Sequence, residues 1–154
     1  MKILNECFIH LIRNSIDHGL EGADERTAAG KSDTGSVRIS FNESSGGTII
    51  MISDDGRGID GKNLAKIAIA KGIITESEAA SLSEQEKLNL VFRAGFSSKS
   101  EATDVSGRGI GMDVVKTNIE LLGGELQLQT TLGQGSTFTI ILGSSVQMPT
   151  GVAV

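Results

Sequence analysis

The stretch TIIMISDDGRGID, residues 48–60, constrains the fold most, because a short apolar run ends abruptly in two carboxylates and two nearby glycines. The run 48–53 is rich in β-branched residues and too short for a stable helix, so we predict a buried strand that carries Asp54 to the end of a sheet. Gly56 and Gly58 permit positive φ and let another group approach closely. We interpret that group as a ligand, with Asp54 accepting a hydrogen bond from an exocyclic amine such as that of adenine. The alternative is a charged turn at a strand end.

Two β-hairpins are predicted from alternating apolar and polar residues separated by glycine-containing turns. The first turn is at Gly46-Gly47, and one face of its hairpin is expected to be buried; the second turn is at 133–135. The four strands are expected at 37–42, 48–53, 125–129 and 137–142.

Helices are predicted where apolar residues recur at three- and four-residue spacing. The first runs from residue 3 to about 18 and ends at Gly19, three short helices follow residue 60, and the last begins after Gly111. This order of helices and hairpins predicts a two-layer α/β sandwich with helices on one face of a mixed sheet.

The composition excludes several classes of function. A chain of 154 residues fits one domain, which we expect at 1–143 with a patternless tail at 144–154. The net charge of −5 and the small set of aromatic residues, all Phe, argue against nucleic-acid binding. No apolar run could span a bilayer and no leader is evident, so we expect a cytoplasmic protein without membrane insertion. The single Cys7 is expected to be a core residue.

The first predicted helix carries an unusual set of polar residues. His10, Asn14 and Asp17 have the spacing i, i+4 and i+7 and would share one stripe, with Arg13 and His18 at its edges. An imidazole, an amide and a carboxylate in line can hold a hydrated cation or a phosphate. The alternative is an ordinary solvated helix face.

A second candidate site lies where 93–106, a small and polar stretch without periodicity, runs into GRGIG at 107–111. We predict a mobile loop with a glycine hinge, followed by a helix N-terminus whose N–H groups and dipole suit phosphate. It is not a dinucleotide fingerprint, because the spacing is G-x-G-x-G and no strand precedes it. A plain helix-entry loop is the alternative.

The polar segment 21–34 is predicted to be a helix-poor connecting loop. Its Gly30-Lys31-Ser32 imitates the end of a phosphate-binding P-loop. Glu25 stands where that motif requires glycine and no apolar strand precedes it, so we interpret the segment as a surface loop.

Five motifs occur in an order and spacing that resemble one family. Taken together they are similar to the ATP-binding domain of histidine kinases, nearest to the chemotaxis (CheA-like) branch, within the GHKL ATPases that include gyrase and the heat-shock chaperones. The resemblance runs from about residue 3 to 142. The motifs are HLIRNSIDHG (10–19), DDGRGID (54–60), FRAGFSSKS (92–100), GRGIGMDVVK (107–116) and GQGSTF (133–138).

The resemblance implies a role for each matching residue. Asp54 would accept a hydrogen bond from the adenine amine, with Gly56, Gly58 and Ile59 bordering the ring and Ser136 replacing a threonine near the adenine. Asn14, with His10, would hold the Mg²⁺ that bridges the phosphates, and His10, Asn14 and Lys99 are implied as catalytic residues. Further nucleotide contacts are implied for Arg13, Asp17, His18, Ser97, Lys99, Gly107, Arg108, Gly109, Ile110, Gly111 and Met112.

The function implied is transfer of the γ-phosphoryl group of Mg-ATP to a histidine on another domain, in a GHKL (Bergerat) fold whose N-terminal strand is missing here. Implied partners are the histidine phosphoacceptor and dimerisation domains of the same kinase or of a partner, and indirectly a response regulator. Two departures are Ile67, where the family often has lysine, and Gly143, where proline is usual. The alternative is a nucleotide-binding regulatory module without turnover; an ATPase of the gyrase or chaperone type is disfavoured, because nothing resembles their transducer domains.

Overall fold

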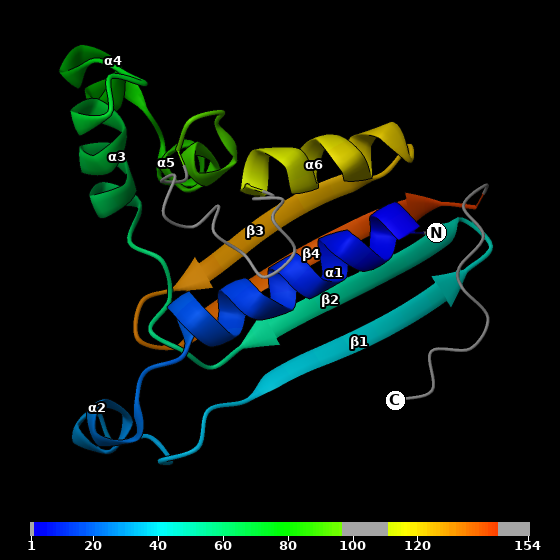
Figure 1. Cartoon of the computed structure of the whole chain (residues 1–154), viewed down its shortest axis with the longest axis horizontal. Coiled ribbons are helices and arrows are strands. Elements are labelled where there is room, and N and C mark those ends of the chain that lie inside the picture. The colour runs from blue at the N-terminus through cyan, green and yellow to red at the C-terminus, as the bar shows by residue number, and fades with distance from the viewer. Residues whose placement is uncertain (1, 97–110, 145–154) are drawn as a thin grey trace. The chain divides into compact units, whose positions relative to one another are not determined.

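The computed structural model describes residues 2–96 and 111–144 (Figure 1). The chain divides into two compact units. The sheet unit comprises Met1–Gly58 and Asn118–Val154, and the helical unit comprises Ile59–Thr117.

The sheet unit contains one four-stranded sheet in the order β1-β2-β4-β3. Both predicted hairpins form, and β2 pairs with β4 to join them. Every pairing among the described strands is antiparallel, so the expected mixed sheet is corrected to an antiparallel one. The strands are β1 (Val37–Ser44), β2 (Gly47–Asp54), β3 (Glu125–Thr131) and β4 (Gly135–Gly143).

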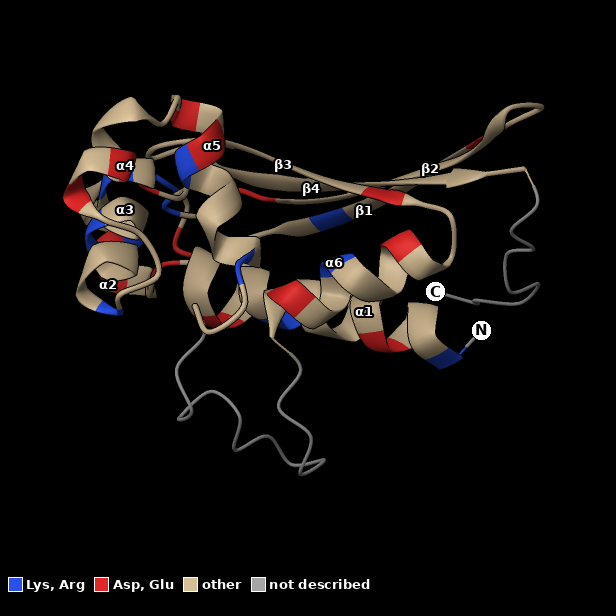
Figure 2. Ribbon diagram, turned by 90° about the horizontal axis from the view of Figure 1, so that it is seen from above, with Lys and Arg blue, Asp and Glu red and all other residues tan. Residues whose placement is uncertain are grey.

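One face of this sheet is covered by α1 (Lys2–Asn14), which runs along the inner strands in Figure 1. Leu4, Cys7 and Leu11 of α1 are buried, as expected for an amphipathic helix. The strands carry few charged residues (Figure 2). The predicted α/β sandwich is confirmed. Its core is completed by side chains of the inner strands β2 and β4 and of the edge strand β3: Ile50, Ile52, Leu126, Leu128, Phe138, Ile140 and Leu142.

The edge strand β1 differs from its prediction. Its residues alternate as expected, but Ile39 and Phe41 are 42% and 50% exposed, so the expected buried face is wrong within the described part of the chain. Phe41 pairs across the strands with the fully buried Ile50. Its ring makes an edge-to-face contact with Phe8, 6.4 Å between centroids. Coverage by α1 therefore reaches the inner strands and only touches the edge.

The segment after α1 is more helical than predicted. Ser15–Gly19 forms a π-helix, in which the N–H of Leu20 donates to the carbonyl of Ser15 at 2.9 Å. The helix α2 (Ala23–Ala28) then lies inside the segment expected to be a loop, which corrects that prediction. It has six residues and no apolar stripe, so its pattern gave no helical signal.

The helical unit contains three short helices in the predicted places. Thr75 with Glu78 and Ser83 with Glu86 form reciprocal capping boxes before the second and third, which satisfy N–H groups that a helix start leaves unpaired. A small core of Ala65, Ala68, Ile74 and Leu90 holds the unit together. The elements are α3 (Gly61–Ala70), α4 (Glu76–Ser81), α5 (Glu84–Asn89), a 3₁₀ turn (Leu90–Phe92) and α6 (Met112–Leu121), which ends in the sheet unit.

Among the described residues, no helix combines the length and apolarity needed to cross a bilayer.

Candidate functional site

Asp54 ends β2 with only 9% of its surface exposed, as the sequence predicted for a carboxylate at a strand end. The backbone N–H groups of Gly56 and Ser136 donate to its Oδ1, at 3.0 and 3.3 Å. Its Oδ2 receives no hydrogen bond from residues 2–96 or 111–144. A nearly buried carboxylate oxygen is stabilised only if something donates to it, so Oδ2 is suited to accept from a ligand or water.

Three chain segments meet around Asp54. The π-helix brings Gly19 so close that a Cβ there would lie 3.0 Å from Asp54 Oδ2. The N–H of Arg57 donates to the carbonyl of Gly19 at 2.9 Å, and the N–H of Gly133 donates to the carbonyl of Arg57 at 2.8 Å. The turn after β2 is thus fixed on one side by the π-helix and on the other by the β3–β4 turn.

Gly56 and Gly58 allow these backbone segments to approach one another closely. A Cβ at Gly56 would lie 2.0 Å from the carbonyl oxygen of Gly19, and one at Gly58 would lie 2.6 Å from that of Thr131. Gly58 also has the positive φ, +74°, that its sequence context predicted. The close approach expected at these two glycines is therefore correct, but the approaching group is the protein's own backbone. The interpretation that their missing side chains make room for a ligand is corrected.

Two hydroxyl groups not singled out by sequence lie beside this site. Thr130 Oγ1 donates to the carbonyl of Gly135 and shares a hydrogen bond with Ser136 Oγ, both at 3.0 Å. Ser15, in the π-helix before Gly19, is 2% exposed, and its hydroxyl has no hydrogen-bond partner in the described structure. Thr130 lies outside the quoted motifs, and Ser15 lies within HLIRNSIDHG (10–19) at a position for which no role was predicted.

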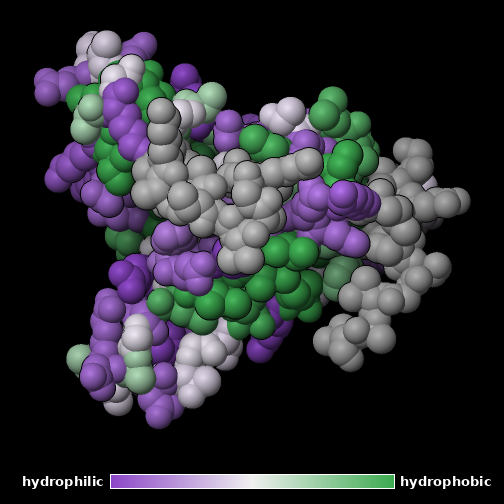
Figure 3. Space-filling view, viewed as in Figure 1, coloured by the Kyte–Doolittle hydropathy of each residue, from purple (hydrophilic) through white to green (hydrophobic). Residues whose placement is uncertain are grey.

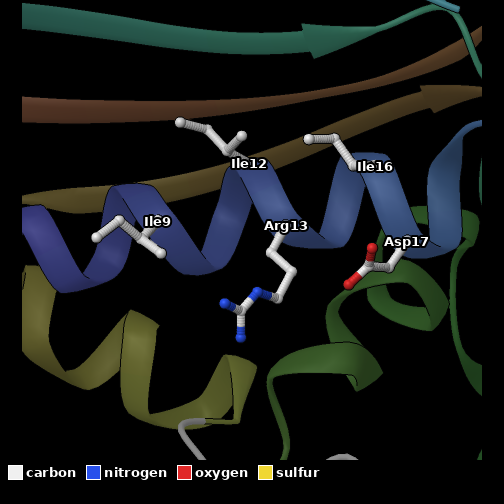
Figure 4. Close-up of a pocket in the computed structure, with 5 residues that line it drawn as sticks. All are labelled: Ile9, Ile12, Arg13, Ile16 and Asp17. Carbon is white, nitrogen blue, oxygen red and sulfur yellow. The ribbon is translucent and has the colours of Figure 1, made fainter. Parts of the chain in front are cut away.

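The polar residues of the first helix divide into two groups. His10 and Asn14 are half-buried on α1, and His18 is exposed on the π-helix. Arg13 and Asp17 instead line a shallow hollow of about 330 Å³ beside α1, together with Ile9, Ile12 and Ile16 (Figure 4). The wider π-turn breaks the α-helical spacing after Asn14, so the predicted stripe of His10, Asn14 and Asp17 is wrong for Asp17.

The surface around this hollow is apolar. Figure 3 shows a hydrophobic area along α1, where Ile9 and Ile16 are 59% and 52% exposed. Ile12 and Ile16 point to one side of the helix and Arg13 to the other (Figure 4). Neither Asp54 nor Asn14 lines the hollow, so we do not place the candidate ligand in it.

No group of three or more His, Cys, Asp or Glu residues in the described ranges is arranged to hold a metal. Mg²⁺ prefers oxygen ligands and is often held by one or two protein oxygens together with substrate phosphates and waters. The amide oxygen of Asn14 fits that chemistry, whereas the imidazole of His10 suits softer metals better.

The other predicted site residues lie elsewhere. Ile59, Gly111 and Met112 belong to the helical unit, where the carbonyl of Gly111 accepts from the N–H groups of Val114 and Val115 at the start of α6. Ser97, Lys99 and the predicted glycine hinge at Gly107, Arg108, Gly109 and Ile110 lie outside the described residues.

A partly buried cluster of ion pairs, unforeseen from the sequence, adjoins Asp54. Arg26 of α2 is 1% exposed and pairs with Glu21 and Asp55, both at 3.0 Å, and Lys31 pairs with Glu21 at 2.6 Å. We call these four residues the ion cluster. The hydrogen bond from Lys31 lowers the pKa of Glu21, and the one from the backbone N–H of Ser36 lowers the pKa of Asp55. The expected surface loop around Lys31 is therefore corrected, because this lysine is turned inward.

Comparison with known proteins places these features in a family. The family model described as "Histidine kinase-, DNA gyrase B-, and HSP90-like ATPase" matches residues 2–145. A gliding motility regulatory protein of Myxococcus xanthus is 43% identical over 94% of this chain and 19% of the relative. The sensor histidine kinase CheAY of Helicobacter pylori is 46% identical over 87% of this chain and 17% of the relative. The chemotaxis protein CheA of Rhizobium meliloti is 43% identical over 98% of this chain and 20% of the relative. The chain thus spans about a fifth of the length of these curated relatives.

Proposed function

This chain belongs to the family of histidine kinase-, DNA gyrase B- and HSP90-like ATPases, and from that premise we propose that it is the ATP-binding catalytic module of a CheA-like histidine kinase. The module binds Mg-ATP and presents its γ-phosphoryl group to a histidine on another domain. The observation that carries the proposal is the carboxylate of Asp54, whose Oδ1 is held by two backbone N–H groups and whose Oδ2 has no donor in the described structure.

Asp54 recognises the base because one of its carboxylate oxygens is held by the protein and the other is left for the ligand. The two N–H groups of Gly56 and Ser136 orient the carboxylate, so that Oδ2 accepts from the exocyclic amine of adenine without first rearranging. The Ser136 and Thr130 hydroxyls next to it supply further polar contacts at the edge of the base.

Asn14 is the residue of the first helix that we assign to Mg²⁺, through its amide oxygen, with His10 one helical turn earlier as a hydrogen-bonding group near the phosphates. Bound Mg²⁺ neutralises phosphate charge, which is the main requirement of phosphoryl transfer. Arg13, Asp17 and His18 remain proposed nucleotide contacts, and so do Ile59, Gly111 and Met112.

The partners follow from the relatives' names. Relatives called chemotaxis protein CheA and sensor histidine kinase CheAY imply a phosphoacceptor histidine, a dimerisation domain and, indirectly, a response regulator. We propose these partners for this module, with residues 1–143 as one ATPase domain and 144–154 as a tail. ATP, the proposed substrate, is a cytoplasmic metabolite, so we propose that the module works in the cytoplasm.

The test is titration of the chain with Mg-ATP before and after Asp54→Asn. The Asn oxygen can still accept from Gly56 and Ser136, which places the amide nitrogen where Oδ2 stood and sets a donor against the adenine amine. Losing one charge-assisted hydrogen bond costs about 1.5–3 kcal/mol, so affinity should fall roughly 10- to 150-fold. The exposed Asp33→Asn removes the same charge and should leave affinity unchanged.

Equal Mg-ATP affinity in Asp54→Asn and the unmodified chain would contradict the assignment of the base site. A second measurement, transfer of label to a separately supplied phosphoacceptor domain, distinguishes a catalytic module from one that binds nucleotide for regulation only. Binding without transfer would favour the regulatory alternative.

A further inference from the structure

The guanidinium of Arg26 uses its nitrogens to join α2 to the turn after β2. Its Nε donates to the carbonyl of Ser32 at 2.7 Å, and its two terminal nitrogens donate to Glu21, to the carboxylate of Asp55 and to the carbonyl of Asp55, the last at 3.2 Å. Only an arginine has a planar fork that reaches so many acceptors at once.

Lys31, which follows the C-terminus of α2, contacts the same turn. Its ammonium donates to Glu21 at 2.6 Å, to the carbonyl of Asp55 at 3.0 Å and to the carbonyl of Gly56 at 2.8 Å. These three acceptors use all three N–H groups of the ammonium, and the side chain is 18% exposed.

The two carbonyl groups that receive these bonds belong to the peptide planes that shape the base site. A peptide group is planar, so the carbonyl of Asp55 and the N–H of Gly56 turn together, as do the carbonyl of Gly56 and the N–H of Arg57. The N–H of Gly56 orients Asp54 Oδ1, and the N–H of Arg57 holds Gly19 against the carboxylate. Each plane is therefore fixed at both ends, by the cations on one side and by the site on the other.

We propose that Arg26 and Lys31 are positioning residues for base recognition: by fixing these two peptide planes they aim the Asp54 carboxylate and set the preference for an amine-bearing purine over an oxo-purine. The inference rests on the proposed function, because it deepens the role of the same site. Neither cation touches the nucleotide.

A merely structural role for the ion cluster makes a different prediction. If the cluster only held α2 to the sheet unit, weakening it would lower the fraction of folded protein, and all ligands would lose affinity by the same factor. If it aims Asp54, weakening it lowers affinity for adenine nucleotides and leaves the weaker affinity for guanine nucleotides unchanged, because a guanine presents an oxygen where adenine presents its amine. The ratio of the two affinities therefore separates the roles.

The experiment compares dissociation constants of Mg-ATP and Mg-GTP for the unmodified chain, Lys31→Met, Lys31→Arg and Glu25→Gln. Lys31→Met should weaken Mg-ATP binding about three- to tenfold, the value of one well-oriented hydrogen bond, with Mg-GTP binding unchanged. Lys31→Arg, which keeps the charge and the donors, should recover part of the loss. Glu25→Gln is the matched control, because Glu25 lies on α2 and, within the described residues, its side chain makes only an exposed pair with Arg57.

Hydrogen exchange supplies a readout that needs no nucleotide. The amides of Gly56 and Arg57 should exchange faster in Lys31→Met than in Glu25→Gln, while the buried strands keep their protection. Arg26→Lys, which keeps the charge but loses the fork, should change exchange and selectivity in the same direction.

If folded Lys31→Met kept the ATP-to-GTP affinity ratio of the unmodified chain, the positioning role would be overturned, whether both affinities stayed the same or fell equally. The proposed function would remain intact. Failure of the unmodified chain to bind Mg-ATP would instead remove the proposed function, and the inference with it.

Discussion

Asp54 uses its two carboxylate oxygens for different purposes, and the glycines around it make this possible. Oδ1 is committed to backbone N–H groups from two separate segments, whereas Oδ2 faces Gly19 without a protein donor in the described residues. A Cβ at Gly19 would lie 3.0 Å from that oxygen, which is closer than ordinary van der Waals contact. The site is therefore shaped by the absence of side chains at positions where backbone segments meet.

Gly56→Ala is predicted to disrupt this arrangement. The new methyl group would lie 2.0 Å from the carbonyl oxygen of Gly19, so the π-helix and the turn must separate. Overpacking of this kind costs about 1–3 kcal/mol or more, and we expect at least a tenfold loss of Mg-ATP affinity. Chemical denaturation and nucleotide titration measure the two effects. Gly72→Ala is the control, because a Cβ at Gly72 meets nothing within 4 Å, and its positive φ of +72°, which Gly56 does not share, destabilises the variant without touching the site. We expect Gly72→Ala to lose stability but keep its full Mg-ATP affinity. Gly56→Ala should lose both stability and affinity.

At this scale the sequence correctly placed Asp54 at the end of a buried strand, because a carboxylate after a β-branched run is a local pattern. It could not show what approaches Gly56 and Gly58, because their neighbours, Gly19 and Thr131, are distant in the chain. Ser15 and Arg26 were missed for the same reason: burial of a single polar side chain depends on tertiary packing.

Among elements, those with local signals formed as predicted and those without did not. Glycine turns and alternating residues specify both hairpins. Capping boxes at Thr75 and Ser83 mark the starts of α4 and α5. The helix α2 lacks an apolar stripe and is anchored by Arg26 through ion pairs, which no periodicity reveals. The exposed face of β1 was also unpredictable, since alternation shows which residues share a face but not whether a helix covers it.

The ion cluster predicts how stability depends on acid. The folded protein lowers the pKa of Glu21 and Asp55, so their contribution is complete above the ordinary carboxylate range and is lost as pH falls below about 4. Lys31→Met removes the main cause of the lowered pKa of Glu21 and should flatten this dependence. Urea unfolding between pH 7 and pH 3 gives the free energy of unfolding for both proteins. Parallel curves for the two would show that the pair of Lys31 with Glu21 does not contribute to this dependence.

At the scale of the whole molecule, the family match covers both the sheet unit and the helical unit, residues 2–145. The sequence predicted the layer architecture because helical and strand periodicities alternate in blocks. It did not predict that the sheet is antiparallel throughout its described strands, because the pairing of β2 with β4 joins residues about 90 positions apart, as in Ile50 with Ile140. Such pairings follow from the complete fold.

The last prediction concerns what this chain cannot do alone: with Mg-ATP it should acquire no stable phosphohistidine. Its two histidines are His10 on α1 and His18 on the π-helix. His18 adjoins Gly19, which borders the Asp54 carboxylate, and the base and the γ-phosphorus are opposite ends of ATP. His10 lies one turn before Asn14, the residue we assign to the metal, and a group that supports the phosphates from that side is poorly placed for in-line attack.

The measurement is incubation with γ-labelled ATP, followed by tests for the acid-labile, base-stable label that marks phosphohistidine. A separately supplied acceptor domain serves as the positive control and should become labelled in the same reaction. Label on His10 without that domain would show that a histidine beside the phosphates can attack in line, and label on His18 would show that the γ-phosphorus reaches the π-helix next to the proposed base site. Either result would contradict this prediction.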